Sequence, residues 1–479
     1  LGFYPGEYTL ISQLIMASAG EKRCIVIGAD MDQEEMNDYI KDNIEIPKNI
    51  RLICRSVDVF DPKALEKCAV SDSMSIIVSP SDDFTTTKIL LALSKVINRK
   101  DNEKVRIGAI TSSPACRFPE TIAKEHNITT LMANQTIAKI IAHSCVQPGL
   151  SETFSEVFNF EGSELFAIPC EGAAGLTFEE LTMKMDRGVP AGIFREGAFM
   201  VNPSSEAVIK AEDKILVFAK DRFSPVITDK EVPAEDPGYT KAAMKEEYGT
   251  VTVIRANESV RTIIQELPEN LNRIIFTNVP DIYRDEMLNL AREKGDIPVE
   301  FLTQDLSDTS ALTKLAERSD HIIVLADHEK DDDTSDMETI FLILNLKDIR
   351  TRCALNYNIT AEMRREYNQS LLGNDENTDF IVASDMSSLF LAQLSESPEL
   401  VSVFNELLSL EGNELYLKKA GTLECDGEKT AAQIRRNALR HGYIFIGYKK
   451  KNENSCFDPA LEEVIRLDPE DSLIVIGEE

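Results

Sequence analysis

The first part of the chain alternates short apolar runs with segments of helical periodicity. Residues 23–28, 50–55, 75–79 and 105–111 form apolar runs with few polar positions on either face. Between and beside them, residues 9–18, 34–42, 61–69 and 87–98 carry apolar side chains at helical spacing. Strands that are buried on both faces and alternate with helices form a parallel sheet covered on both sides. The pattern therefore predicts a doubly wound, Rossmann-like α/β unit.

A different pattern follows this unit. A strand at residues 129–133 and a helix at 135–146 complete the α/β part. Short strands at 164–168, 192–195 and 214–218 then surround a helix at 177–185, which predicts a small α+β subdomain. Residues 221–248 are rich in Pro, Asp, Glu and Lys, and this composition predicts a linker.

The same order of patterns occurs twice. Residues 148–165, PGLSETFSEVFNFEGSEL, return at 398–415 as PELVSVFNELLSLEGNEL. Apolar runs at 250–254, 273–277, 321–325, 351–355 and 379–383 predict a second set of strands, with helices at 339–346 and 386–394 and a closing strand at 472–476. A repeat this long indicates a duplicated domain. We predict Rossmann-like units at 1–147 and 250–397, α+β units at 148–220 and 398–479, and a linker at 221–249.

The net charge and the arrangement of the cysteines argue against several classes of function. The net charge of −31 argues against binding to nucleic acid or directly to anionic lipid, because like charges repel. The nine cysteines form no CxxC pair and the five histidines are dispersed, so we expect reduced thiols and no zinc site. The motifs GxSxG, HExxH and the P-loop are absent, and we expect no enzyme activity. The first residues resemble the end of a strand, so we expect a fragment of a longer protein.

The first candidate ligand site lies at the carboxyl ends of the first set of strands, where doubly wound sheets bind ligands. Its residues are Gly2, Phe3, Gly6, Asp30, Ser56, Asp58 and Ser79. Asp30 stands where an acid that binds a ribose would lie, which predicts a nucleotide. The segment GFYPG departs from GxGxxG, however, so an ordinary turn with a helix-capping Asp is the alternative. In the second half Arg255 and Ala256 replace the glycines, which argues against a nucleotide there.

The second candidate site is an acidic segment, DHEKDDDTSDME, at residues 327–338, directly after the predicted strand at 321–325. Ca²⁺ takes six to eight oxygen ligands. Several carboxylates could supply them: Glu329, Asp331, Asp332, Asp333 and Asp336. No EF-hand spacing is present. The alternative is a solvated loop before a helix, whose N-terminus favours negative charge.

Several strings carry a resemblance to a known family. They are RLICRSVD at 51–58, SIIVSPSDD at 75–83, HSCVQPGLSETFSEVFNFEGSEL at 143–165 and FIVASDMSSLFLAQLSESPELVSVFNELLSLEGNELYLK at 380–418. They resemble the cytosolic region of the CASTOR/POLLUX ion-channel family and its bacterial relatives, which is built from tandem RCK (regulator of K⁺ conductance) domains. The resemblance implies a homotetramer with eight such units, in a ring on the cytoplasmic side of the cell membrane, below an N-terminal pore domain.

These observations lead to one expected function and two alternatives. We expect a non-enzymatic module that couples the binding of a ligand, Ca²⁺ or a nucleotide, to the gating of a cation channel, with K⁺ as the expected ion. The helices at 136–144 and 386–393 are expected either to assemble the ring or to be buried in the core. The alternatives are an NAD-dependent oxidoreductase, which would need a better glycine loop, and a soluble regulatory subunit of a separate K⁺ transporter.

Overall fold

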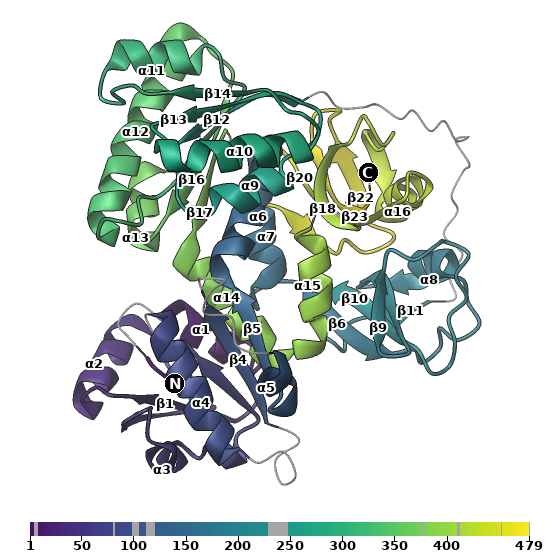
Figure 1. The fold of residues 1–479 in the computed structure, drawn as a ribbon. Coiled ribbons are helices and arrows are strands. Elements are labelled where there is room, and N and C mark those ends of the chain that lie inside the picture. Colours follow the sequence, from purple (N-terminus) through teal and green to yellow (C-terminus); the bar gives the residue numbers. More distant parts are fainter. Residues whose placement is uncertain are drawn as a thin grey trace.

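The chain forms two Rossmann-like units and two small α+β units (Figure 1). The computed structural model describes residues 1–3, 8–79, 82–97, 105–111, 120–228, 248–373, 375, 377–409, 412–451 and 453–478. The first Rossmann-like unit lies at the bottom of Figure 1 and the second at the top, while the two small sheets lie side by side at the right. This arrangement confirms the predicted fold class of two tandem units.

The second Rossmann-like unit contains a complete parallel sheet. Its six strands have the order β14-β13-β12-β15-β16-β17, in which the first strand of the unit lies in the middle. The strands are β12 (Tyr248–Ile254), β13 (Leu271–Thr277), β14 (Val299–Leu302), β15 (His321–Val324), β16 (Asn358–Met363) and β17 (Thr378–Val382). The helices are α9 (Val260–Glu266), α10 (Asp281–Glu293), α11 (Thr309–Ala316), α12 (Asp332–Cys353) and α13 (Glu366–Gln369). Helices on both faces bury the central strands, which explains their apolar sequences.

The first Rossmann-like unit contains two separate parallel sheets. One pairs β1 (Arg23–Ala29) with β2 (Ile50–Ser56), and the other contains β3 (Ser75–Val78), β4 (Arg106–Thr111) and β5 (Ile128–Met132). The helices of this unit are α1 (Tyr8–Met16), α2 (Gln33–Asn43), α3 (Pro62–Leu65), α4 (Asp83–Val96) and α5 (Glu120–Glu125). Residues 1–3 lie between the two sheets: the amide of Gly2 donates to Gly28 O at 2.9 Å, and the amide of Ser79 donates to Leu1 O at 3.1 Å.

The small units share one topology. Their four-stranded sheets have the orders β6-β10-β8-β9 and β18-β23-β20-β21, so each strand has a counterpart in the other sheet. The strands are β6 (Glu164–Pro169), β8 (Val189–Arg195), β9 (Ala198–Val201), β10 (Lys214–Ala219), β18 (Glu414–Lys419), β20 (Tyr443–Lys449), β21 (Cys456–Phe457) and β23 (Ser472–Gly477). The helices α8 (Phe178–Lys184) and α16 (Ala431–Arg440) both begin with a capping box, at Thr177 and Thr430. This correspondence supports the duplication.

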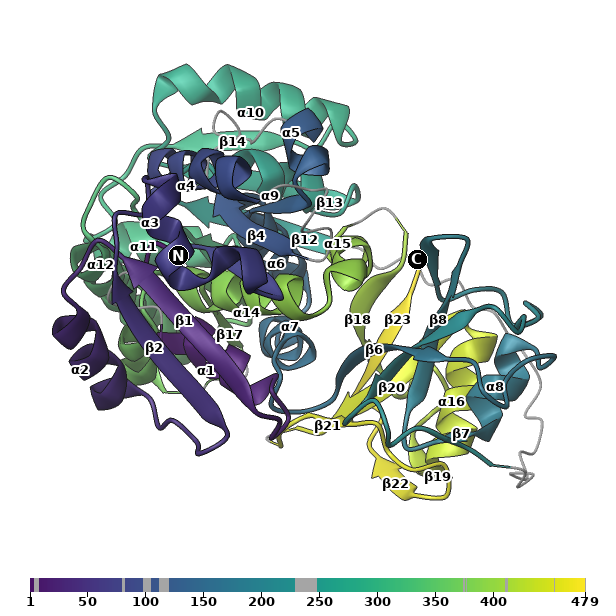
Figure 2. The same ribbon diagram turned by 90° about the horizontal axis from the view of Figure 1, so that it is seen from below.

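The two halves exchange helices across their interface. Helix α6 (Ala133–Val146) of the first half packs against α9 and β16 of the second, and α14 (Ala383–Glu396) of the second half packs against α1 and β4 of the first. Figure 1 shows α14 and α6 between the first Rossmann-like unit and the second, and Figure 2 shows the same helices from below. Helices α7 (Leu150–Phe158) and α15 (Val401–Leu407) then lead into the small units. The segments 136–144 and 386–393 therefore lie largely in this internal interface.

Ion pairs and hydrogen bonds fix the exchanged helices. Arg23 of β1 pairs with Glu396 at 2.6 Å, and Lys139 of α6 lies 3.6 Å from Glu266 of α9. Buried Gln393 donates to Phe158 O at 2.9 Å. Each Rossmann-like unit is thus covered in part by a helix from the other half.

Two sequence-based predictions need revision. The predicted strand at 351–355 is wrong, because α12 continues to Cys353 and ends at Ala354, which has a left-handed φ of 51°. Ile343, Leu346 and Ile349 keep the helical stripe buried up to that end. The predicted linker begins with a short strand, β11 (Val226–Ile227), which pairs with β7 (Met185–Asp186). No helix within the described ranges combines the length and apolarity needed to span a membrane.

Candidate functional site

The carboxyl ends of β1, β2 and β3 share one edge with the segment at residues 1–3. Ala29 and Ser56 are partners in the parallel β1–β2 register, so Asp30 follows directly beside Ser56. Gly2, with a φ of 86°, donates to Gly28 O, and Ser79 donates to Leu1 O. The structure therefore brings Gly2, Asp30, Ser56 and Ser79 to one edge of the interrupted sheet. Asp30 and Ser56 are exposed there, where a ligand can reach them.

The remaining predicted nucleotide-site residues have other surroundings. Phe3 is buried and packs edge-on against Tyr39, with 5.9 Å between ring centroids, so its side chain belongs to the core. Asp58 accepts a hydrogen bond from the amide of Phe60 at 2.9 Å, which closes a local turn. Gly6 lies outside the described residues. A nucleotide site at this edge stays a prediction that would rest on Gly2, Asp30, Ser56 and Ser79.

The same edge of the second unit is filled by an arginine. Leu325 donates to Ile254 O at 3.1 Å, as Ser79 donates to Leu1 O, so Arg255 occupies the position of Gly2. Its φ of 68° is also left-handed. The guanidinium donates to Leu325 O at 3.2 Å and to Thr339 Oγ1 at 2.9 Å. Burial lowers the pKa of Arg255, although Glu338 and Asp327 oppose this. The protein's own cation thus lies where a Rossmann fold binds phosphate.

A cluster of polar side chains next to Arg255 was not predicted from the sequence. His328 Nδ1 lies 2.7 Å from Glu258 Oε1, and His328 Nε2 lies 3.2 Å from Glu362 Oε1. Asn257 donates to Glu362 Oε2 at 2.9 Å, and Asn134 of α6 donates to Glu258 Oε1 at 2.8 Å. The cluster joins the loops after β12 and β15 to β16 and to a helix of the first half. The sequence contains one signal for this cluster, because His328 is the single histidine in the acidic segment at residues 327–338.

The two carboxylates set the charge of this cluster. Burial lowers the pKa of His328, but the hydrogen bonds and charges of Glu258 and Glu362 outweigh burial and raise it to about 9. The hydrogen bond from His328 lowers the pKa of Glu258. His328 is therefore an imidazolium at neutral pH, held between two carboxylates. It ties three segments of the second unit together.

The carboxylates of the acidic segment have separate partners. Asp331 caps α12 by accepting from Thr334 N at 3.0 Å, and Asp332 pairs with Arg364 and with Arg365. Asp333 accepts from the hydroxyl of Tyr367, whereas buried Asp336 accepts from the amides of Arg364 and Arg365 and from Asn368 Nδ2. Within the described ranges, no three His, Cys, Asp or Glu side chains gather as metal ligands would. A Ca²⁺ site that includes Glu329 stays a prediction and would require these side chains to rearrange.

Comparison with known proteins identifies relatives of the whole chain. A family model described as Castor and Pollux, part of voltage-gated ion channel, matches residues 134–232. The ion channel CASTOR of Lotus japonicus is 22% identical over 521 aligned residues, which cover 96% of this chain and 59% of that protein. The ion channel POLLUX of Lotus japonicus is also 22% identical, over 472 aligned residues that cover 87% of this chain and 50% of that protein. The chain is related to the CASTOR and POLLUX channels.

The relationship confirms the resemblance seen in the sequence. The matched region, 134–232, begins in α6 and includes α7 and the first small sheet. The chain spans only 59% and 50% of the length of these two relatives. The human SLO3 gating ring has the same fold: its TM-score is 0.63 at 13% identity, with 98% of this chain and 97% of that chain covered.

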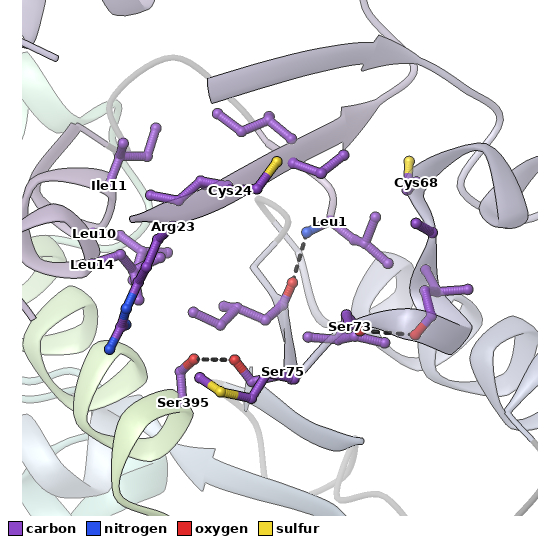
Figure 3. Close-up of a pocket in the computed structure, with 18 of the residues that line it drawn as sticks. Leu1, Leu10, Ile11, Leu14, Arg23, Cys24, Cys68, Ser73, Ser75 and Ser395 are labelled. Atoms are coloured by element: carbon purple, nitrogen blue, oxygen red, sulfur yellow. Dashed lines mark hydrogen bonds between the residues drawn. The ribbon is translucent and has the colours of Figure 1, made fainter. Parts of the chain in front are cut away.

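A cavity of about 400 Å³ lies between β1 and β3 of this CASTOR/POLLUX relative. Figure 3 shows Cys24 and Arg23 on one side, Ser75 and Ser395 on another, and Leu1 beside the hydrogen bond that its backbone nitrogen donates to Ile77 O at 2.6 Å. Helix α1 contributes Leu10, Ile11 and Leu14 to the wall. The cavity reaches the edge at Ser79 and extends from there along the strands toward their amino ends, and Asp30 does not line it.

Proposed function

We propose that the chain is the cytosolic gating-ring module of a cation channel, with K⁺ as the conducted ion and no enzyme activity of its own. Its relatives along nearly the whole chain are named ion channels, and its fold is that of a gating ring. In the complete protein the module would follow an N-terminal pore domain and lie on the cytoplasmic side of the membrane.

The exchange of helices α6 and α14 between the halves is the observation that carries this proposal. A module that controls a pore must convert a local change at a ligand site into movement of a larger body. Asn134 of α6 donates to Glu258, which follows the carboxyl end of β12 in the second unit. Helix α14 packs against α1 and β4 of the first unit. A movement of the strand ends in either Rossmann-like unit would therefore displace a helix that belongs to the other half.

The sensor site in this proposal is the exposed edge of the first unit. It would bind a nucleotide, with Asp30 accepting a hydrogen bond from a ribose hydroxyl and the backbone near Gly2 approaching a phosphate. The contrast with the second unit supports this choice. Arg255 fills the corresponding space there, whereas Gly2 has no side chain. Ca²⁺ at the acidic segment is a second candidate ligand.

The ring would be a homotetramer that brings eight Rossmann-like units together. Equivalent helices of the two units support assembly, since α4 and α12 each follow the strand next to the sheet centre and each exposes apolar side chains. Phe84 is 75% exposed and Leu91 45% on α4, and Phe341 is 59% exposed and Leu344 49% on α12. Duplicated apolar faces of this kind fit contacts with further copies of the chain.

Ion flux through the full-length protein in liposomes tests the proposal. We expect K⁺ flux that responds to added NAD or ATP, a response that Asp30→Ala abolishes and that Asp38→Ala, at an exposed acid on α2, leaves intact. Flux without any nucleotide response would reject the sensor site but keep the channel. The absence of flux from protein that is folded and assembled would reject the channel itself.

A further inference from the structure

One buried arginine connects the two small units. Arg435 of α16, in the second small unit, is fully buried. Its guanidinium donates to Met185 O at 2.8 Å and to Gly188 O at 3.1 Å in the first small unit. It also donates to Pro459 O of its own unit at 3.1 Å. A charge buried this deeply needs hydrogen bonds and a counter-charge, so the acids around Arg435 decide the charge balance of the interface.

Two acids, one from each small unit, act on this arginine. Asp458 follows β21, and its Oδ1 lies 3.6 Å from Nη2 of Arg435, with 7% of the side chain exposed. Asp186 of β7 belongs to the first small unit and accepts from the amide of Leu461, in the second, at 2.9 Å. Burial lowers the pKa of Arg435 to about 10, against the charges of Asp458 and Asp186. The interface thus holds one cation and two carboxyl groups, and a single proton balances their charge.

The contacts of Asp458 fit a carboxyl group that carries this proton. The separation of 3.6 Å is too long for the hydrogen bond that an ionised carboxylate forms with an adjacent arginine. Among the described residues, neither Asp458 Oδ1 nor Arg435 Nε has a hydrogen-bond partner. Burial raises the pKa of Asp458 to about 7, against the charge of Arg435 and the amide of Gly188, and the charge of Asp186 adds to the increase. Asp458 therefore gains or loses its proton near neutral pH.

The first small unit has an uncharged version of the same corner. Asn202 follows β9, and its amide donates to Ala191 O of β8 at 2.9 Å. Asp458 follows β21, and its amide donates to Ile446 O of β20 at the same distance. Both residues have a left-handed φ, of 45° and 48°. The side chain of Asn202 donates to Gly442 O across the interface at 2.8 Å. Since an amide is close in shape to a protonated carboxyl group, an uncharged side chain fits this corner.

We propose that a proton on Asp458 holds the two small units together, and that its loss to solvent as the pH rises past neutrality loosens their interface. When the units separate, Asp458 reaches water and its pKa returns to a value near 4. The joined arrangement therefore binds the proton more tightly than the separated one. Its stability is highest at acidic pH and decreases as the pH rises through the pKa of the joined form. This switch does not depend on the channel function.

Hydrogen exchange at the amide of Leu461 tests the proposal, because this amide donates to Asp186 across the interface. Its protection factor, corrected for the intrinsic pH dependence of exchange, reports how often the small units open. We expect this factor to fall roughly tenfold or more between pH 5 and pH 8 in the wild-type chain. Asp458→Asn keeps the side chain neutral and should hold the factor at its low-pH value throughout. Asp468→Asn, at an exposed acid of the same small unit, is the matched control and should retain the wild-type fall.

The small sheets themselves supply the control for folding. Protection of the amides in β10 and β23, each an inner strand of one small sheet, shows that a variant is folded. The proposal is overturned if the wild-type factor does not change with pH, or if Asp458→Asn keeps the wild-type fall. Should Asp458→Asn fail to fold, Asp186→Asn decides instead, since it removes one of the two acids and keeps an acceptor for the amide of Leu461. We expect the fall to occur at lower pH in this variant, and an unshifted midpoint would overturn the charge balance assigned to the interface.

Discussion

Asp379 of β17 accepts a hydrogen bond from the amide of Gly149, 2.9 Å away, across the interface between the two halves. It also accepts one from the hydroxyl of Ser151 in α7. Burial raises the pKa of Asp379 to about 6, although the hydrogen bonds from Ser151 and Gly149 oppose this. A buried carboxylate of the second half thus anchors the turn between two helices of the first half.

We expect Asp379→Asn to destabilise the protein. The amide group of asparagine has one acceptor oxygen, which can serve the amide of Gly149. Its NH₂ group would then donate to the oxygen of Ser151, so the hydroxyl proton of Ser151 would lose its acceptor. A buried unsatisfied donor costs about 1–3 kcal/mol, and thermal or urea denaturation measures this loss. The matched control is Asp348→Asn, at an exposed acid on α12, which should change stability little. Equal stabilities of the two variants would contradict the role assigned to Asp379.

The stability of the protein should fall as pH rises from about 5 to 8. Burial is the main cause that raises the pKa of several carboxyl groups to about 7: Glu156, Glu164, Asp385 and Asp458. Their unfolded values lie near 4, so the folded state binds protons more tightly within this interval. The free energy of unfolding is therefore highest below the unfolded pKa and decreases as pH rises through the folded pKa.

Asp385→Asn isolates one of these carboxyl groups. Asp385 accepts from Thr9 Oγ1 at 3.1 Å, and the charge of Glu366 adds to the effect of burial on its pKa. Asparagine cannot ionise, so the free energy of unfolding of the variant should depend less steeply on pH between 5 and 8. Urea denaturation at both pH values gives the slope. A variant profile parallel to the wild-type profile would show that Asp385 does not take up a proton on folding.

The apolar face of α12 should control assembly. Phe341→Asp places a charge on this face, and we expect it to reduce the oligomeric mass of the full-length protein measured by light scattering. Ile282→Asp is the matched control, because Ile282 is 80% exposed on α10, outside the proposed contact. If both variants keep the wild-type mass, α12 does not form the contact between copies.

The strands and the duplication were predictable because they depend on local pattern. Parallel strands buried on both faces give apolar runs such as the segment at 23–28, and the repeated segment keeps its spacing in both halves. Strand β16 was missed because it carries Thr360 and Glu362 at buried positions. Glu362 is tolerated there because Asn257, His328 and the amide of Ala326 satisfy it.

The relations between distant segments were not predictable from pattern. The apolar faces of α6 and α14 indicate burial, but nothing in their periodicity shows that each covers the other half. The cluster of Glu258, His328 and Glu362 likewise combines segments far apart in the chain. Arg255 was recognised as a departure from a glycine loop, yet its bonds to Leu325 and Thr339 depend on the sheet that surrounds it.

Arg255→Gly tests whether this arginine closes the edge of the second unit. Glycine adopts the left-handed φ of 68° without strain, which favours the variant, but it removes the donors to Leu325 O and Thr339 Oγ1. Hydrogen bonds from charged groups contribute about 1.5–3 kcal/mol each, so we expect a net loss in the free energy of unfolding. Asp296→Gly, at an exposed residue with a left-handed φ of 56°, controls for the backbone effect. A variant as stable as wild type would mean that Arg255 does not hold this edge together.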